Sequence, residues 1–296
     1  VAYKTFDGTG GEKGMKKKVN VGKGLFLLAV FCIMFLGSCM KPEAASRMKK
    51  LKVGRTYTTR LTGNEKHKVK FTYTKRIDFD AGVLNLYVDG KLVKRIRRYA
   101  FTWEVNLCRV SPKRTLLYLR DCSNNDYNEY MKLLEYKDGR FIELGDLVGL
   151  TRNESYEQTD KLLSGWARGH LRKVGANKVV VRWMDTGMAT GIFYVDIPYK
   201  ISGDEVSRMG ESYVLKATSW IKTKWTANRS IAAYTSVGGN KKSFSVHKGE
   251  KVTGLKMIKK NGTFYFQIRN SKGKKGWFKD SNYTIGQYFK EAVFAG

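Results

Sequence analysis

Apolar and polar residues alternate along most of the chain after residue 46, and turn-forming residues interrupt the alternation roughly every 8–12 positions. Two pairs of alternating runs each enclose an Asp-Gly dipeptide. They are 82–88 and 91–96 around Asp89 and Gly90, and 130–136 and 141–144 around Asp138 and Gly139. Both residues of such a tight turn need a positive φ, so each pair is predicted to form a β-hairpin.

Strand-like runs also fill most of the chain between and beyond these hairpins. They are 69–74, 101–110, 115–120, 179–184 and 191–197. Residues 151–171 depart from the pattern because they contain few β-branched side chains, and a short helix is expected there around 156–163. The predicted fold class is therefore all-β. Its first domain, over 51–212, is expected to be a meander, a sandwich or an incomplete propeller-like sheet.

The N-terminal region has a different pattern, because residues 25–36 (LFLLAVFCIMFL) contain no charged side chain. Lysines follow Met15, and the small residues Gly37 and Ser38 end the apolar stretch. This layout is typical of a secretory signal peptide, and the stretch is shorter than the ~20 residues of a membrane-spanning helix. We interpret residues 15–39 as the signal, and the polar residues 1–14 as an upstream extension outside the fold.

The end of this stretch, Leu36-Gly37-Ser38-Cys39, resembles the lipobox of bacterial lipoproteins. The resemblance implies that Cys39 carries the lipid and becomes the mature N-terminus, and residues 40–50 are then expected to be a linker. Two other interpretations stay open: a signal cleaved after Ser46, which would release the protein, and a buried apolar element with a chance cysteine. Both signal interpretations place the folded part outside the cytoplasm.

A second resemblance covers residues 213–296. It is carried by 226–234 (TANRSIAAY), 247–252 (HKGEKV), 263–268 (TFYFQI) and 273–278 (GKKGWF). In this order they resemble the SH3-like domain of bacterial cell-envelope proteins, which implies a small β-barrel at the C-terminus. With the lipobox, the chain as a whole resembles a Gram-positive (Clostridia-type) envelope lipoprotein or secreted protein.

Charge sharpens the expected type of partner. The 296 residues carry 56 Lys+Arg against 26 Asp+Glu, a formal net charge of +30, and 42% are hydrophobic. The apolar fraction excludes an intrinsically disordered chain, and the charge alone would indicate nucleic acid. A protein outside the cytoplasm instead meets wall polymers and anionic lipids. The charge is densest in residues 213–296, with 17 basic and 3 acidic side chains.

Ligand contacts are predicted within this basic segment. The candidates are Trp220, Trp225, Tyr234, Lys274 and Lys275, three aromatic residues beside a loop where such barrels bind and two members of a lysine cluster. Trp277 is expected instead to anchor the core of the barrel, because a tryptophan in a strand is more often buried than bound to ligand.

Signatures of catalysis are missing from the sequence. His67, His170 and His247 are scattered, and the chain has no phosphate loop, dinucleotide fingerprint or metal-ligand spacing. No catalytic residue, metal site or cofactor is therefore predicted. Cys108 and Cys122 are candidate disulfide partners, since disulfides form outside the cytoplasm, although their register in a hairpin is poor.

These patterns together predict a non-catalytic, extracytoplasmic binding protein, tethered to the membrane by its lipid or secreted. Its basic SH3-like domain is expected to recognise cell-wall polymer or peptidoglycan, and nucleic acid is not expected as a partner. The alternative is a cell-envelope hydrolase whose first domain is catalytic and whose SH3-like domain targets the wall. Converging carboxylates, or Cys108 beside His170, would favour the hydrolase.

Overall fold

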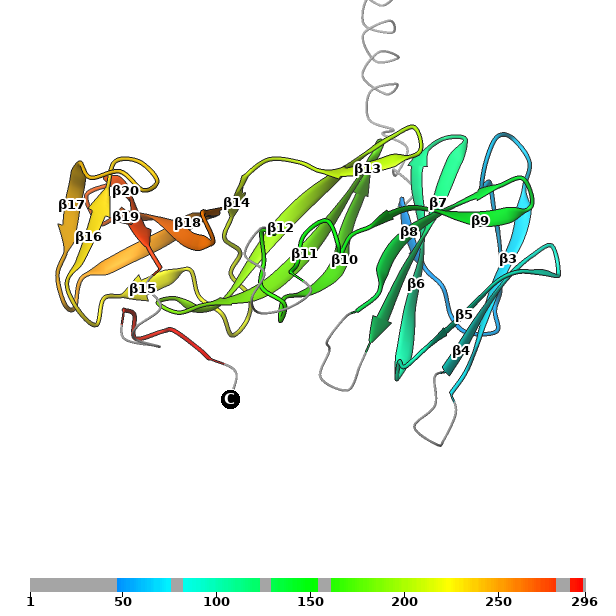
Figure 1. Cartoon of the computed structure of the whole chain (residues 1–296), viewed down its shortest axis with the longest axis horizontal. Helices are drawn as coiled ribbons and strands as arrows, with labels where there is room; N and C mark the ends of the chain where they lie inside the picture. Colours follow the sequence, from blue (N-terminus) through cyan, green and yellow to red (C-terminus); the bar gives the residue numbers. More distant parts are fainter. Residues whose placement is uncertain (1–46, 76–81, 123–128, 154–160, 281–287, 295–296) are drawn as a thin grey trace, which may run out of the picture. The chain divides into compact units, whose positions relative to one another are not determined.

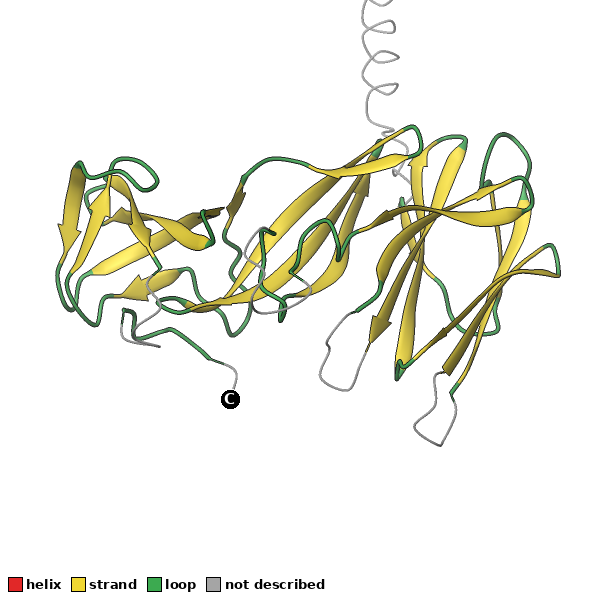
Figure 2. Cartoon of the chain, in the orientation of Figure 1, coloured by secondary structure: helices red, strands yellow, loops and turns green. Residues whose placement is uncertain are grey.

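The computed structural model describes residues 47–75, 82–122, 129–153, 161–280 and 288–294. Residues Ser46–Gly296 form one compact unit, and all regular elements among the described residues are β-strands (Figure 2). These residues include no helix long and apolar enough to cross a membrane. The predicted signal, the lipobox with Cys39 and most of the predicted short helix lie outside the described residues, and Lys161–Leu163 are not helical. The all-β prediction is confirmed.

Two antiparallel sheets pack face to face at the beginning of the compact unit (Figure 1). One sheet has the order β2 (Thr56–Thr59), β3 (His67–Thr74), β4 (Gly82–Val88), β5 (Lys91–Arg98). The other has the order β1 (Met48–Lys50), β6 (Thr102–Ser111), β7 (Arg114–Cys122), β8 (Met131–Lys137), β9 (Arg140–Asp146). Alternate apolar side chains of both sheets, among them Phe71, Leu86 and Leu119, share one buried cluster. Burial of these alternating positions holds the sandwich together.

Both predicted hairpins are confirmed. Asp89 and Gly90 have φ values of 50° and 82° between β4 and β5. Asp138 and Gly139 have φ values of 50° and 76° between β8 and β9. The positive φ at both turn positions is the conformation that Asp-Gly sequences adopt most readily, so the dipeptide sets the register of each hairpin.

The central strands of the five-stranded sheet are buried on both faces. In β7, Leu117 and Leu119 belong to the cluster shared with β2–β5, while Leu116 and Tyr118 belong to a second cluster on the opposite face. Neighbouring residues of a strand point to opposite faces, so an uninterrupted apolar run requires cover on both sides. This second cover is a further sheet that begins at residue 168.

The third sheet has the order β10 (Arg168–Gly175), β11 (Lys178–Gly187), β12 (Gly191–Ser202), β13 (Glu205–Arg208). Its core includes Trp183 and Tyr199. The indole Nε1 of Trp183 donates a 2.8 Å hydrogen bond to the phenol oxygen of Tyr199. The sequence predicted β11 and β12 but missed β10, which contains two glycines and several charges. Gly169 packs closely there, since a Cβ atom at this position would lie 2.7 Å from Met131.

The C-terminal residues form an antiparallel sheet of seven strands. They are β14 (Ser212–Val214), β15 (Lys224–Thr226), β16 (Ile231–Tyr234), β17 (Lys242–Val246), β18 (Lys251–Lys260), β19 (Thr263–Asn270) and β20 (Lys275–Lys279). Their order is β14-β18-β19-β20-β16-β17, and β15 also pairs with β18. The aromatic and Gly-Trp motifs noted in the sequence lie on β19 and β20. The SH3-like barrel itself stays a prediction.

The hydrophobic core continues across the predicted domain boundary at residues 212 and 213. Phe193 of β12 packs edge-on against Phe264 and Phe266 of β19, with ring centroids 5.5 Å and 5.3 Å apart. Asp280, directly after β20, accepts backbone N–H bonds from Met188 and Ala189 in the turn between β11 and β12. The segments 51–212 and 213–296, predicted to be two domains, therefore share one hydrophobic core.

Two details of the predicted organisation are corrected. The linker expected over residues 40–50 is too long, because Met48–Lys50 form β1 and pair with β6. The candidate disulfide is not formed: Cys108 lies opposite Leu116 and Cys122 opposite Thr102, and both residues are thiols. The two cysteines are six residue pairs apart along the hairpin, about 20 Å at strand spacing, whereas a disulfide requires Cα atoms within about 7 Å.

Replacing Gly191 with alanine is expected to lower the free energy of unfolding by more than the roughly 1–2 kcal/mol of left-handed strain alone, because the new Cβ atom also meets a backbone atom. Gly191 has φ 67°, and a Cβ atom there would lie 2.4 Å from the carbonyl oxygen of Val293. That oxygen accepts a 2.7 Å hydrogen bond from the Ile192 N–H, so the collision would loosen residues 288–294 from β12. Urea unfolding measures the change.

The matched control is Gly203→Ala, since Gly203 has φ 57° but no atom within 4 Å of the point that a Cβ would occupy. Alanine at this site introduces the left-handed strain without the collision. A loss no larger for Gly191→Ala than for Gly203→Ala would contradict the close approach of Val293.

Candidate functional site

A basic and aromatic surface lies on the side of the C-terminal sheet that faces away from its buried residues. We call it the outer face. Its members are exposed or half-buried and alternate in each strand with core residues: Tyr234, Lys242, Lys256, Ile258, Lys260, Tyr265, Gln267, Arg269, Lys275, Trp277 and Lys279. The alternate positions Met257, Phe266 and Phe278 are buried. The strand period of two therefore separates a packed side from a side available to a ligand.

Strand register places the members of the outer face in rows across the sheet. Trp277 of β20 lies opposite Gln267 of β19 and Tyr234 of β16. Tyr265 lies opposite Lys279 on one side and Ile258 on the other. Residues directly opposite in an antiparallel pair share a face with Cβ atoms about 5 Å apart. Three aromatic rings thus lie on three adjacent strands.

Cations surround these rings, and the acidic residues of the same segment lie elsewhere. The outer face carries six basic side chains and no acidic one among its eleven members. Glu250 lies in a turn and accepts the His247 N–H, Glu291 binds Thr226, and Asp280 is buried. The positive potential of the outer face is therefore not neutralised within its own sheet.

The residues predicted to contact ligand are divided between different places. Tyr234 and Lys275 belong to the outer face. Lys274 lies in the adjoining β19–β20 turn, where its Nζ donates a 3.2 Å hydrogen bond to the Ser243 carbonyl oxygen. Trp225 is buried, with its ring centroid 4.8 Å from that of Phe289. Its indole packs in the core against Gly254 of β18, where a Cβ atom would lie 2.4 Å from the Trp225 ring.

Trp220 is half exposed but does not belong to the outer face. Its ring lies edge-on to Tyr194 of β12, with centroids 6.1 Å apart, so it packs on the third sheet. Trp277 was expected in the core and is instead half-buried on the outer face, while its neighbour Phe278 is 2% exposed. Alternation in β20 shows that Trp277 and Phe278 point to opposite sides of the sheet. The pairing with β19 shows that Phe278 is the one that points into the core.

Sequence reasoning missed Tyr265, Gln267, Lys256 and Lys279 as site residues. Tyr265 and Gln267 lie within the motif 263–268, and Lys256 and Lys279 are among the 17 basic residues of the C-terminal segment, but no pattern in the sequence marks any of the four as a ligand contact. The alternation of apolar side chains in β19 was the available signal, since Phe266 and Ile268 are buried and the residues between them are not. What the sequence lacks is the register that brings these positions beside Trp277.

Cys108 and His170, the pair that would have favoured a hydrolase, have different surroundings in the structure. The Cys108 side chain is buried, and burial raises its pKa far above the usual range of a thiol. The Cys108 Sγ contacts the backbone oxygen of Asn106, whereas His170 lies on β10 opposite Arg182. Burial and the nearby Arg120 lower the pKa of His170. A protonated thiol is a poor nucleophile, so this pair gives the hydrolase no support.

Of the four buried carboxylates in the described residues, Asp121, Asp185 and Asp280 accept backbone N–H groups of loops and turns, and Glu135 is ion-paired with Arg114. Asp121 accepts the backbone N–H groups of Glu129 and Tyr130 and lies 3.6 Å from the Arg98 Nε. Asp185 accepts hydrogen bonds from the backbone and side chain of Ser164. The described residues contain no group of three or more His, Cys, Asp or Glu side chains placed to hold a metal ion.

Comparison with protein-family models, with curated proteins and with solved structures finds no match to this chain. The described residues themselves show an all-β protein of antiparallel sheets with a basic, aromatic outer face on its C-terminal sheet.

Proposed function

We propose that this protein is a non-catalytic, extracytoplasmic binding protein that recognises an anionic cell-wall polymer through the outer face. The observation that carries the proposal is the coincidence of six cations and three aromatic rings on one exposed sheet face. Lipidation at Cys39, or secretion after cleavage near Ser46, would deliver this face to the wall. Mass spectrometry of the mature N-terminus, on protein purified from cells, distinguishes lipidation at Cys39 from cleavage near Ser46.

The charge distribution supports an extended anionic ligand. The basic residues of the outer face lie on β17, β18, β19 and β20, so they cover the sheet from one side to the other. The five strands from β18 to β17 span about 19 Å at the usual spacing between strands. A linear polymer with regularly spaced negative charges can contact several of these cations at once, which adds their individually small contributions.

The aromatic rings support a ligand that also has carbon surface to cover. Tyr234, Tyr265 and Trp277 are half-buried, so each presents part of its ring to solvent. Aromatic side chains at a binding surface supply large contact area at low entropic cost, and the sugar or polyol units of a wall polymer offer C–H surface to them. Single-stranded nucleic acid would use the same chemistry. The signal-like N-terminus favours the wall polymer.

The test compares binding to purified wall sacculi before and after chemical removal of their anionic polymers. The double variant Lys275→Glu/Lys279→Glu is expected to bind intact sacculi at least about 30-fold more weakly, because losing two lysines that each contribute about 1 kcal/mol near an anionic surface already has that effect and the two new carboxylates add repulsion. Both lysines flank Trp277 on β20 and are exposed. Deleting residues 213–296 is a poorer test, since these residues share their core with the third sheet.

The control has the same change in charge at a different surface. Lys178→Glu/Lys200→Glu reverses two exposed lysines that lie opposite each other on β11 and β12. We expect this control to retain most of the wild-type binding. Equal weakening by both double variants, unchanged binding to stripped sacculi, or stronger binding to a single-stranded oligonucleotide than to sacculi would contradict the proposal.

A further inference from the structure

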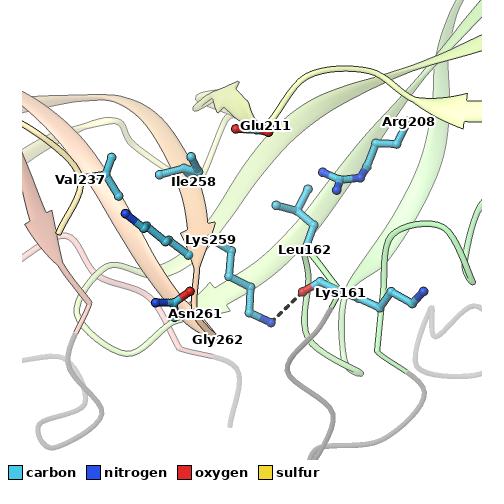
Figure 3. Close-up of a pocket in the computed structure, with 10 residues that line it drawn as sticks. Lys161, Leu162, Arg208, Glu211, Val237, Ile258, Lys259, Asn261 and Gly262 are labelled. Carbon is cyan, nitrogen blue, oxygen red and sulfur yellow. Dashed lines mark hydrogen bonds between the residues drawn. The ribbon is translucent and has the colours of Figure 1, made fainter.

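A pocket of about 570 Å³ opens beside the outer face, between the β18–β19 hairpin and the end of β13 (Figure 3). Ile258 and Lys260 belong both to the outer face and to the lining of this pocket. A polymer that lies across the outer face can therefore place one of its units in the pocket. The volume lies within the 300–1,000 Å³ typical of small-ligand sites.

Cations dominate the polar lining. Lys161, Arg208, Lys259 and Lys260 line the pocket together with a single acid, Glu211. In Figure 3 the Lys161 side chain extends away from Lys259, so the charges that face one another are those of Arg208, Lys259 and Lys260 with Glu211. Three positive charges against one negative charge favour an anionic group, and the fork of an arginine suits the oxygen atoms of a phosphate. The lining cations come from three different parts of the chain: the segment after residue 160, β13 and β18. Only the folded structure brings them together.

Two of these cations are held in place by their neighbours. The Arg208 Nη1 donates a 2.8 Å hydrogen bond to the Tyr213 phenol oxygen, and its guanidinium lies 5.9 Å from the Tyr213 ring centroid. The Lys259 Nζ donates a 2.8 Å hydrogen bond to the Lys161 carbonyl oxygen, the dashed contact in Figure 3. A cation that is already positioned loses less conformational entropy when it binds an anion.

The other residues that line the pocket indicate which groups the ligand carries besides its anionic group. Leu162, Val237 and Ile258 supply apolar surface, and the Glu211 carboxylate can accept a hydrogen bond from a hydroxyl group. A bare phosphate would leave the apolar surface and the acid unused. A phosphate carried on a short hydroxylated carbon skeleton would use all three kinds of group.

We infer that this pocket binds a phosphate ester of a polyol or sugar, as the phosphate-bearing unit of the anionic polymer. The inference deepens the proposed function and rests on it for the biological source of the ligand. It names phosphate, rather than carboxylate, as the anionic group that the protein selects. The pocket itself can be tested with a small probe independently of the polymer.

The probe is glycerol phosphate, titrated calorimetrically into the protein, with glucuronate as the carboxylate comparison. We expect saturable binding of glycerol phosphate with one site per chain, and weaker binding of glucuronate. Arg208→Met and Lys260→Met should each weaken glycerol phosphate binding by about tenfold or more, the usual effect of losing a charge-assisted hydrogen bond. Lys260 is exposed on β18, so its variant decides the test if Arg208→Met fails to fold.

Glu211→Gln supplies a second, opposite readout. Removing this acid should strengthen the binding of inorganic phosphate, because a like charge is lost, and should reduce the preference for glycerol phosphate over inorganic phosphate. The matched control is Lys241→Met, an exposed lysine of the β16–β17 loop outside the pocket lining, which should leave the titration unchanged.

The outcomes separate this inference from the proposed function. Absence of saturable glycerol phosphate binding, stronger binding of glucuronate, or equal affinities in wild type, Arg208→Met and Lys260→Met would overturn the inference even if the protein binds sacculi. Saturable binding that Lys260→Met weakens and Lys241→Met does not would support it, even if binding to sacculi failed.

Discussion

Replacing Arg114 with methionine is expected to lower the free energy of unfolding by about 3–5 kcal/mol, the usual cost of leaving a buried charge without its partner. The Arg114 guanidinium binds both carboxylate oxygens of Glu135, at 2.6 Å and 2.7 Å, and also the carbonyl oxygen of Gly203 at 2.7 Å. The Glu135 side chain is only 7% exposed. Methionine keeps much of the aliphatic volume and removes the charge.

Two further variants show whether the ion pair causes this loss. Arg140→Met removes an exposed arginine from β9 of the same sheet and should change stability by less than about 1 kcal/mol. Arg114→Met/Glu135→Leu removes both charges and should regain much of the stability, because no uncompensated carboxylate remains. Urea unfolding measures all three. A loss below about 1 kcal/mol for Arg114→Met would show that Glu135 does not depend on it.

The stability of the protein is expected to fall by about 2–3 kcal/mol from about pH 4 to about pH 8 through Asp280 alone. Burial raises the pKa of Asp280 from 3.8 to about 6 in the folded protein, and the nearby Asp185 raises it further, while hydrogen bonds from the Ala189 and Met188 N–H groups oppose the rise. A carboxyl with a raised folded pKa binds its proton more tightly when folded. Its contribution is therefore present at low pH and is lost as the pH rises through about 6.

The Asp280→Asn variant isolates this effect. Asparagine resembles the protonated carboxyl and cannot ionise, so the variant should gain about 2–3 kcal/mol relative to wild type between the two pH values. Asp138→Asn controls for the loss of one carboxyl, because Asp138 is an exposed turn residue with φ 50°, a conformation that asparagine also adopts. A constant difference between wild type and Asp280→Asn across this pH range would contradict the prediction.

Asp280 connects this stability effect to the proposed binding surface. It directly follows Lys279 of the outer face, and its carboxylate holds the turn between β11 and β12. The same residue therefore fixes one edge of the C-terminal sheet to the third sheet. Its titration is expected to affect how firmly the outer face is held, as well as the overall stability.

Local sequence was sufficient where one or two residues decide the backbone. Asp89-Gly90 and Asp138-Gly139 predicted their hairpins because few other residues accept positive φ at both turn positions. Alternation predicted β3, β4, β11 and β12 because half-buried strands expose every second side chain. It missed β10, which contains Gly169. Glycine has low strand propensity, and it fits there because Met131 packs so closely that a larger residue has no space.

The candidate site was only partly accessible from sequence. The sequence shows the density of positive charge in residues 213–296, and two of the residues predicted to contact ligand, Tyr234 and Lys275, lie on the outer face. Trp225 and Trp277 were assigned to the wrong environments, since the first is buried and the second faces outward. Residue type cannot decide between core and surface for tryptophan. The decision depends on which strand lies opposite and on which face of the sheet is covered.

Single residues and short sequence periods were enough to predict the all-β fold class, the concentration of basic charge near the C-terminus and the positions of the two Asp-Gly turns. Only the folded chain shows that six cations and three aromatic rings share one face, and that Arg208 and Lys260 line one pocket. These are distances between strands that are far apart in sequence, and they depend on register and on packing against a shared core.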